Sequence, residues 1–487
     1  MRNHLIAIAL LALAVRLAHS RVLWIEEAYP MAAAIQILHG RLPYADFWYD
    51  KPPLTPLLYL LWGAAPGWAP RLAGALYVTA CAALAGRLGG VWSAWLLAFS
   101  LSFGLPSAVI ALAPDLLLIA PHLAVVSLAQ AGRPLLAGLT AGLALLIHAK
   151  ALFLLPIALL WAPHWRLLAG FAAAALPQAL LGPDYWQQVW AWGRLYSTHT
   201  FVDHPLAEFA RRTANWAGFH LATLTPLLTR RLPWRHAAWL ALSLASVLLG
   251  LRFFPRYYFF LLVPCAVLAG PCLEALRPVW RYSLLALVLI PVLRFGPRHL
   301  TVASGNLSWE DLALFRDSQT VAAYLREQSK PSDTLFVWGY RPDIDSLSRL
   351  PGGTPFLESQ PLNCVLADRH LRSTQPLPDP ACPARLRRFR ESEPTWLVDG
   401  LGPLNPRLRL EAYRSLRGYE LVLRTPSALL YRLAVPQNQP IEARSINPRP
   451  PHGPGEYDAP PHTHSSSWPA SAGIPATPPT PLPRFSS

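Results

Sequence analysis

The sequence predicts a mainly α-helical, polytopic membrane protein of about eleven transmembrane helices, with a small C-terminal α/β or α+β domain and a disordered tail. Hydrophobic residues make up 53% of the 487 residues, and Asp, Glu, Lys and Arg together only 14%, whereas soluble domains carry about 25% charged residues. Successive apolar runs fill residues 1–299, and residues 300–434 are more polar. Residues 435–487 are rich in Pro, Ser and His without periodicity, which is typical of disorder.

The net charge of +15 has two explanations, nucleic-acid binding or basic loops beside a membrane. The basic residues are dispersed over short loops between apolar runs rather than clustered in one soluble region. This distribution favours a lipid bilayer as the partner, and we expect no nucleic acid.

The first apolar run, residues 5–20, follows Arg2 and His4 and superficially looks like a signal peptide. Arg16 interrupts its hydrophobic core and acidic residues follow at once, which favours an uncleaved first span with a cytoplasmic N-terminus. The first loop, residues 22–70, is then expected on the outer side of the membrane.

Residues 52–67 hold about 12 apolar residues between proline pairs, fewer than the roughly 20 that a transmembrane helix needs. We expect an amphipathic or half-inserted helix at the outer surface. The short basic loops then fall on the cytoplasmic side, as the positive-inside rule predicts. The further spans are expected near residues 71–87, 91–105, 115–130, 134–148, 151–162, 166–182, 214–229, 236–251, 257–274 and 281–296.

A longer outer loop is expected over residues 183–213. Its aromatic side chains, Trp186, Trp190, Trp192 and Tyr196, suggest a helix at the membrane interface, where such residues settle. An aromatic belt is favoured here over stacking on a sugar.

The polar region 300–434 predicts a small mixed domain on the outer side. Its pattern is a helix at 317–329, a strand at 333–340, a helix at 383–393, a strand at 394–400 and a hairpin at 419–433. Cys364 and Cys382 could pair if this domain faces an oxidising compartment, which their spacing alone leaves open. The sequence has no GxGxxG, no P-loop and no metal-ligand spacing.

The first loop is unusually acidic for such an apolar chain, since it holds Glu26, Glu27, Asp46 and Asp50 together with Lys51. These charges lie beside the first predicted span. Several charges on the same side of the membrane and close to it favour a functional explanation. The structural alternative is an ion-pair network that holds the loop in place.

Further charges are predicted on the same side. Asp115 is the only acid between residues 52 and 182, and Arg71, Lys150, Arg252 and Arg256 lie on the outer side against the positive-inside trend. A charge at membrane depth costs roughly 2.5–3.5 kcal/mol, so it indicates function unless it snorkels to the interface. Together these acids and bases favour a reaction site.

Such a site could deprotonate an acceptor hydroxyl with a carboxylate and hold a departing phosphate with cations. Glu26 and Glu27 point about 100° apart on a helix, so that one could act on the acceptor while the other orients it. A divalent Mg²⁺ or Mn²⁺ ion bound by Glu26, Asp50 and Asp115 stays an open alternative, since no full ligand set is evident.

The motif order resembles the GT-C membrane glycosyltransferases. It runs E-E-A-Y, H-G-R-L-P-Y-A-D-F, D-K-P-P-L, Arg71 before a span, and P-D-L-L-L, and it is most similar to bacterial relatives of protein O-mannosyltransferases and of the lipid A aminoarabinose transferase. The resemblance covers residues 1–300, and V-W-G-Y-R-P and E-P-T-W-L-V-D extend it into the later domain.

The resemblance implies inverting transfer of a sugar from a polyprenyl-phosphate monosaccharide to a lipid, glycan or protein acceptor, at the outer face of the cytoplasmic membrane. It implies catalytic roles for Glu26, Glu27 and Asp115. It implies contacts to the donor phosphate for Lys51, Arg71 and Arg256, and supporting roles for Asp50, Tyr29 and Lys150. One departure is that Glu26 stands where the family usually has Asp.

Two other functions are compatible with the sequence. A lipid or sugar transporter would place its site at mid-membrane between repeated halves, and no internal repeat is evident. A catalytically inactive scaffold would present the C-terminal domain but leave the clustered charges without a purpose.

Overall fold

The computed structural model describes residues 1–434 except 201, 307 and 308. Within this range the chain forms one compact unit that contains both the helices and the sheet. The prediction of a disordered tail over 435–487 lies outside the described residues.

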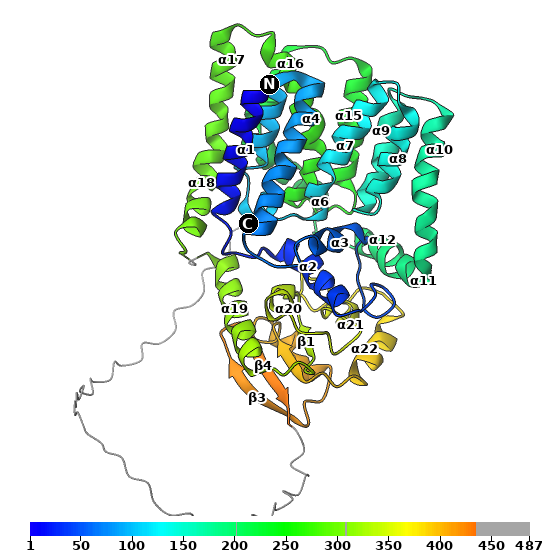
Figure 1. Cartoon of the computed structure of the whole chain (residues 1–487), viewed down its shortest axis with the longest axis vertical. Coiled ribbons are helices and arrows are strands. Elements are labelled where there is room, and N and C mark those ends of the chain that lie inside the picture. The colour runs from blue at the N-terminus through cyan, green and yellow to red at the C-terminus, as the bar shows by residue number, and fades with distance from the viewer. Residues whose placement is uncertain (201, 307–308, 435–487) are drawn as a thin grey trace, which may run out of the picture. The chain divides into compact units, whose positions relative to one another are not determined.

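Helices make up the first three hundred residues, and several of them run roughly parallel in Figure 1. Their first half comprises α1 (Arg2–Leu17), α2 (Ile25–Leu38), α3 (Leu54–Leu60), α4 (Trp68–Ser100), α5 (Pro106–Val109), α6 (Pro114–Leu117), α7 (Ile119–Gln130), α8 (Pro134–Ala144), η1 (Ala149–Phe153) and α9 (Leu154–Leu159). Their second half comprises α10 (Trp165–Ala175), η2 (Leu176–Leu181), α11 (Gly182–Tyr185), η3 (Trp186–Ala191), α12 (Trp192–Thr198), α13 (Pro205–Phe219), α14 (Leu221–Leu224), η4 (Thr225–Thr229), α15 (Trp234–Leu248), η5 (Pro255–Tyr258), α16 (Phe259–Glu274), α17 (Pro278–Leu285), η6 (Ala286–Val288) and α18 (Leu289–Ala303).

The number of membrane spans is supported only in part. Helical segments occupy every predicted span, but within the described residues only four helical stretches are long and apolar enough to cross a membrane: Trp68–Ser100, Trp165–Thr198, Pro255–Glu274 and Pro278–Ala303. The apolar segments Pro114–Gln130, Pro134–Ala144 and Ala149–Leu159 are shorter. The structure therefore shows a membrane-type helical fold and not the count of eleven.

Gly90 divides α4 into two arms. Its backbone is left-handed, with φ of 83°, a conformation that glycine adopts without a steric penalty. A Cβ added at Gly86 would lie 3.4 Å from the Cβ of Ala94, whereas eight residues of continuous helix would separate them by about 12 Å. The chain therefore reverses at Gly90, in agreement with two predicted spans, 71–87 and 91–105.

The segment predicted not to cross, 52–67, contains only the short helix α3. Its 7 residues extend about 10 Å, far less than the roughly 30 Å hydrocarbon core of a bilayer. The chain then turns at Gly63, where φ is 65°.

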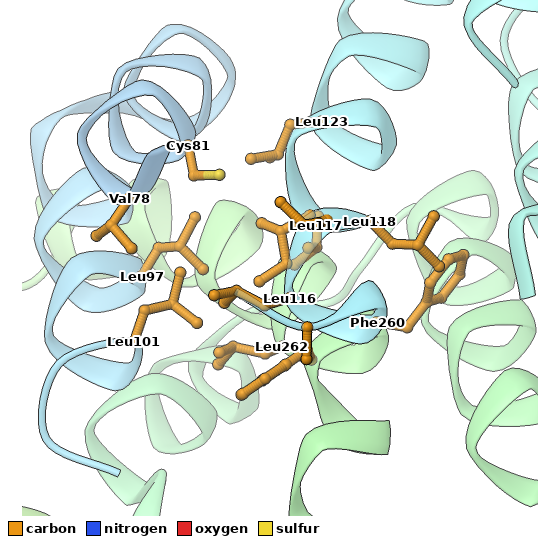
Figure 2. Packing of buried hydrophobic residues seen from close by; sticks show 14 of the residues in the cluster. Val78, Cys81, Leu97, Leu101, Leu116, Leu117, Leu118, Leu123, Phe260 and Leu262 are labelled. Atoms are coloured by element: carbon orange, nitrogen blue, oxygen red, sulfur yellow. The ribbon is translucent and has the colours of Figure 1, made fainter. Parts of the chain in front are cut away.

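The largest apolar core joins the two arms of α4 to α6, α7 and α16. Figure 2 shows Leu97 and Leu101 of one arm beside Leu116, and Cys81 of the other arm beside Leu123. Phe260 and Leu262 of α16 belong to the same cluster. Between helices in a bilayer, such side chains stabilise the fold by close van der Waals packing rather than by removal from water. This core fixes the start of α6, which carries Asp115.

Residues 310–434, here called the sheet region, contain a mixed four-stranded sheet in the order β1-β2-β4-β3. β1 and β2 are parallel and the other neighbours antiparallel. The predicted helix–strand–helix–strand–hairpin pattern is confirmed, and Cys364 and Cys382 form a disulfide. The elements are α19 (Glu310–Gln328), β1 (Leu335–Trp338), α20 (Pro342–Ser348), α21 (Gln360–Asn363), α22 (Cys382–Arg390), β2 (Trp396–Asp399), η7 (Pro406–Leu408), η8 (Leu410–Ala412), β3 (Tyr419–Arg424) and β4 (Leu429–Leu433).

Hydrogen bonds join the sheet region to the first loop. The Ser346 hydroxyl donates to the Ala28 carbonyl of α2 at 2.9 Å, and the Gly352 N–H donates to Gln36 Oε1 at 2.7 Å. Arg349 donates to the carbonyls of Gly63 and Ala64, both at 2.9 Å. These contacts set the acidic start of α2 against the sheet region.

The aromatic segment at 183–198 also meets the sheet region. Trp192 is buried and packs edge-on against Trp48, with ring centroids 5.6 Å apart. Arg385 of α22 lies over both rings. The prediction of a membrane-interface belt is therefore wrong for Trp192, because protein rather than lipid covers it.

Candidate active site

The neighbouring acids at the start of α2 have different environments. Glu27 is fully buried and forms a bidentate ion pair with Arg71, which also donates to the Val22 carbonyl at 2.7 Å. Glu27 also accepts the Trp24 N–H at 3.0 Å, satisfying a backbone donor at the helix N-terminus. This pair joins the start of α2 to α4. Glu26, one residue earlier, points elsewhere because successive helical side chains diverge by about 100°.

Glu26 pairs with Arg256, at the start of η5. Arg256 also reaches Asp115, since its Nε lies 3.5 Å from Asp115 Oδ2. The other oxygen of Asp115 accepts from Lys150 Nζ at 2.7 Å. Lys150 in turn lies 3.4 Å from the ring centroid of Tyr257. One connected set of charges thus brings together α2, α6, η1 and η5.

Asp50 and Lys51 form a second ion pair, with Lys51 Nζ 3.0 Å from Asp50 Oδ2. The side chain of Lys51 is 37% exposed, whereas that of Asp50 is only 8% exposed. Burial alone would lower the pKa of the Lys51 ammonium, but the adjacent Asp50 carboxylate outweighs it and raises that pKa, so Lys51 is a cation at neutral pH. Tyr44, with its backbone at φ of 70°, donates its hydroxyl to the Lys51 carbonyl at 2.8 Å and fixes this turn.

These side chains surround a cavity of about 280 Å³, which we call the polar cavity. Each acid in its wall has a basic partner: Glu26 with Arg256, Asp50 with Lys51, Asp115 with Lys150, and Asp368 with Arg252. Its lining residues are Ile25, Glu26, Asp50, Lys51, Ala113, Pro114, Asp115, His148, Tyr196, Phe254, Arg256, Tyr257, Tyr340, Gln360, Ala367 and Asp368.

Two less polar cavities continue from the polar cavity. The first, the bridging cavity, has a volume of about 290 Å³ and shares Glu26, Arg256 and Tyr340 with it. The second, the apolar cavity, measures about 320 Å³, shares Leu105 with the bridging cavity and is lined mainly by apolar and aromatic side chains of α4, α13, α16 and α18. The Glu26–Arg256 pair therefore stands between a charged space and a hydrophobic one.

Five predicted site residues line the polar cavity, namely Glu26, Asp50, Lys51, Asp115 and Arg256. Four others support it from outside. Lys150 contacts two lining residues, Asp115 and Tyr257. Tyr29 is buried against the rings of Tyr49 and Tyr340, and Glu27 and Arg71 bind each other.

The sheet region supplies lining residues that the sequence did not indicate: Tyr340, Gln360, Ala367 and Asp368. Of these four residues, only Tyr340 belongs to a motif noted in the sequence, since it ends the predicted V-W-G-Y strand. Asp368 forms an ion pair with Arg252, and its carboxylate also accepts a hydrogen bond from the Tyr196 hydroxyl at 3.3 Å. No local pattern relates residues this far apart along the chain.

Glu358 lies behind this wall and holds Gln360 in place. Its two carboxyl oxygens accept from the Gln360 N–H at 2.7 Å and from Gln360 Nε2 at 2.9 Å. Glu358 is only 2% exposed, and burial, assisted by the negative charge of Asp50, raises its pKa to about 8. The Oε1 of Gln360 accepts the Ala367 N–H at 2.8 Å, which completes the cavity wall.

The proposed metal ligands do not converge. Among the residues that the structure describes, no group of three or more His, Cys, Asp or Glu side chains is placed to hold a metal ion. Glu26, Asp50 and Asp115 each face a cation instead. This donor set does not fit Mg²⁺ or Mn²⁺, which require several converging oxygen ligands.

Neither a protein-family model nor a curated protein sequence matches the chain. Among solved structures, it is similar to ArnT from Cupriavidus metallidurans bound to undecaprenyl phosphate, with a TM-score of 0.58 and 15% identity over 89% of this chain and 98% of that one. The apo form of the same ArnT gives a TM-score of 0.54 at 15% identity, over 89% of this chain and 98% of that one.

The Archaeoglobus fulgidus oligosaccharyltransferase in complex with Zn and sulfate gives 0.43 at 12% identity, over 89% of this chain and 74% of that one, a likeness too distant to carry an argument here. At these identities the ArnT structures show the fold. That fold is the one of the GT-C membrane glycosyltransferases, as the motif resemblance predicted.

Proposed function

We propose that this protein is a membrane glycosyltransferase that moves a sugar from a polyprenyl-phosphate monosaccharide to a lipid, glycan or protein acceptor, with inversion at the anomeric carbon. The observation that carries the proposal is the position of the Glu26–Arg256 pair, which lines both the polar cavity and the bridging cavity. A lipid-linked phosphosugar needs such a junction, because its sugar is polar and its carrier is apolar.

The lipid carrier fits the less polar side of the junction. The bridging cavity leads from Glu26 towards the apolar cavity, whose aromatic and aliphatic lining suits a prenyl chain. Lys51 and Arg256 are the more exposed basic side chains near the junction, with 37% and 24% exposure. They suit the donor phosphate, since charge-assisted hydrogen bonds to phosphate are among the strong ones.

The sugar fits the polar cavity. Tyr196, Tyr257 and Tyr340 place aromatic rings in its wall, and Gln360 adds an amide. Aromatic rings pack against the C–H faces of sugars, while amides and carboxylates bind hydroxyl groups. A cavity that combined only charges would suit an inorganic anion better than a sugar.

In the proposed step the acceptor oxygen attacks the anomeric carbon from the face opposite the phosphate. The new O–C1 bond forms as the C1–O bond to phosphate breaks, so the configuration inverts. Glu26 takes the proton of the acceptor hydroxyl, and polyprenyl phosphate leaves with the bonding electron pair, stabilised by Lys51 and Arg256. Donor binding draws Arg256 towards phosphate and thereby frees the Glu26 carboxylate.

The remaining site residues have positioning roles in this proposal. Asp115, which is itself paired with Lys150, orients Arg256, and Asp50 orients Lys51. Glu27 and Arg71, predicted as catalytic and phosphate-binding residues, receive a structural role instead, because neither lines the cavity.

The proposal places the cavity on the outer face of the cytoplasmic membrane, with the N-terminus inside. Its support is the distribution of basic residues over the alternate short loops, which also requires about eleven spans. The charges gather where loops and the sheet region meet rather than between repeated halves, which favours transfer over transport.

The test is transfer by the purified, reconstituted protein from a labelled polyprenyl-phosphate monosaccharide. Glu26→Gln is expected to reduce transfer about 10²–10⁴-fold, the usual contribution of a general base, and Glu26→Asp to retain part of it. Glu420→Gln, an exposed acid on β3, is the matched control and should transfer normally. Retained transfer with both Glu26 variants would remove Glu26 as the base. Mass spectrometry of envelope glycans from a strain lacking the gene would then identify the sugar.

A further inference from the structure

A fourth cavity lies beside the Trp48–Lys51 segment, which also lines the polar cavity. It has a volume of about 280 Å³ and is formed by the first loop, the aromatic segment and the sheet region. We call it the acceptor cavity, because we propose that it binds a glycan chain whose end enters the polar cavity. This inference rests on the proposed function and narrows its acceptor to a glycan of several sugars.

The rim of the acceptor cavity carries polar groups that have no partner. The side chains of Asp184, Gln187 and Arg388 are exposed, and none of these side chains makes a hydrogen bond or an ion pair within the described part of the chain. Asp184 and Arg388 have opposite charges yet do not pair. A carboxylate, an amide and a guanidinium kept apart around one cavity offer both acceptors and donors, as sugar hydroxyls require.

The floor of the acceptor cavity is rigid and aromatic. Tyr44, Phe47 and Trp48 line it and are all more than nine-tenths buried. The buried Gln188 ties this floor down, since its Oε1 accepts the Tyr49 N–H at 2.9 Å and its Nε2 donates to the Tyr44 carbonyl at 2.8 Å. A preformed floor lowers the ordering cost of binding.

The acceptor cavity and the polar cavity have lining residues on the same two segments of chain. Trp48 lines the former and Asp50 the latter, only two residues later. On the aromatic segment, Asp184 borders the acceptor cavity and Tyr196 the polar cavity, which places them about 18 Å apart at 1.5 Å per residue. A ligand that occupies both cavities is therefore an extended chain and not a single sugar.

The chemistry favours a glycan over a lipid or a polybasic peptide. The lining has no continuous aliphatic surface for an acyl chain, and the apolar cavity already offers one elsewhere. Its rim carries one acid and one exposed arginine, so it presents no acidic cluster for a basic peptide. Aromatic edges surrounded by mixed polar groups suit the alternating C–H and O–H surface of a sugar.

The test measures binding of the full-length protein, in detergent, to an array of bacterial envelope oligosaccharides that range from monosaccharides to long chains. We expect retention of long chains and not of monosaccharides. The combined variant Gln187→Ala with Arg388→Ala should lose about tenfold or more in affinity, as expected for a lost charge-assisted hydrogen bond. Arg387→Ala is the matched control, because Arg387 is exposed on the same helix but does not line the cavity.

Equal binding by the rim variant, or no binding of any oligosaccharide by the unmodified protein, would overturn the inference. A second measurement separates it from the proposed function. The rim variant should still release sugar from a polyprenyl-phosphate monosaccharide to water while losing transfer to long acceptors. Glycan binding without any such release would instead refute the transferase and leave the glycan site standing.

Discussion

Arg256 bridges two carboxylates, because it pairs with Glu26 through Nη1 while its Nε lies 3.5 Å from Asp115 Oδ2. Asp115 therefore orients the guanidinium of Arg256 at the junction of the cavities. The planar guanidinium of Arg256 has several N–H donors, so it can exchange Glu26 for a phosphate while it keeps its contact with Asp115. This arrangement explains why an arginine suits position 256 better than a lysine.

Substitution of Arg256 should affect catalysis more than folding. We expect Arg256→Lys to lower kcat/KM about 10²–10³-fold, the range seen when one donor to a developing negative charge is removed. Lysine keeps the positive charge, but its compact ammonium lacks the planar set of donors with which a guanidinium can contact Asp115 and a phosphate at the same time. The measurement is steady-state transfer, with thermal unfolding in detergent as the folding control. Unchanged kcat/KM would show that Arg256 does not bind the leaving phosphate.

Lys51 should act mainly on donor affinity. Lys51→Met removes the ammonium while keeping a similar length, and the donor KM should rise about tenfold or more, since hydrogen bonds to charged groups contribute about 1.5–3 kcal/mol. Lys51→Arg should restore part of the affinity. Titration with polyprenyl phosphate itself, followed by tryptophan fluorescence, checks binding apart from chemistry. An unchanged KM and affinity in Lys51→Met would contradict the assignment.

The buried pair Glu27–Arg71 should be structural. Glu27→Gln or Arg71→Met alone leaves one buried charge without its partner, which costs about 3–5 kcal/mol. The double variant Glu27→Gln with Arg71→Met removes both charges and should be less destabilised than the sum of the single variants. Thermal unfolding of all four proteins gives the coupling free energy. Additive losses would mean that the two side chains do not stabilise each other.

Much of the fold could be predicted from the sequence, because hydrophobic runs and strand patterns are local. The reversal at Gly90 followed from two apolar runs around it, and the strands at 335–338 and 396–399 from their apolar and aromatic residues. Charges against the local trend indicated Glu26, Asp50, Lys51, Asp115 and Arg256, which do meet.

The different partners of Glu26 and Glu27 could not be predicted, because they depend on which neighbour of α2 faces each side chain. The contributions of Gln360 and Asp368 depend on contacts between the first loop and the sheet region. Such contacts join residues about three hundred positions apart and leave no local pattern. The sequence therefore indicated which charges gather in the candidate site but not which of them pair with each other.

The disulfide between Cys364 and Cys382 should stabilise the wall of the polar cavity. It lies next to Gln360 and Asp368 in the sequence and closes a loop with a separation of 18 residues. Closing a loop of this size contributes about 3 kcal/mol in the chain-entropy model. The double variant Cys364→Ser with Cys382→Ser should lower the unfolding temperature and raise the donor KM. The same double variant should be insensitive to dithiothreitol, whereas the unmodified protein should respond to it.

Glu358 should make stability depend on pH. Burial raises its pKa from 4.5 to about 8, so between these values the folded protein holds a proton that the unfolded chain releases. Stability therefore falls as pH rises through this window and levels off above about 8. Glu358→Gln mimics the protonated form, since its amide keeps one acceptor for the Gln360 donors.

The variant should match the unmodified protein at pH 5 and unfold at a higher temperature at pH 9. Thermal unfolding measured across this range, with Glu420→Gln as the exposed control, decides the matter. Parallel curves for Glu358→Gln and the unmodified protein would show that Glu358 is ionised at neutral pH. In that case a second negative charge would stand behind Asp50, and Lys51 would have to compensate two carboxylates rather than one.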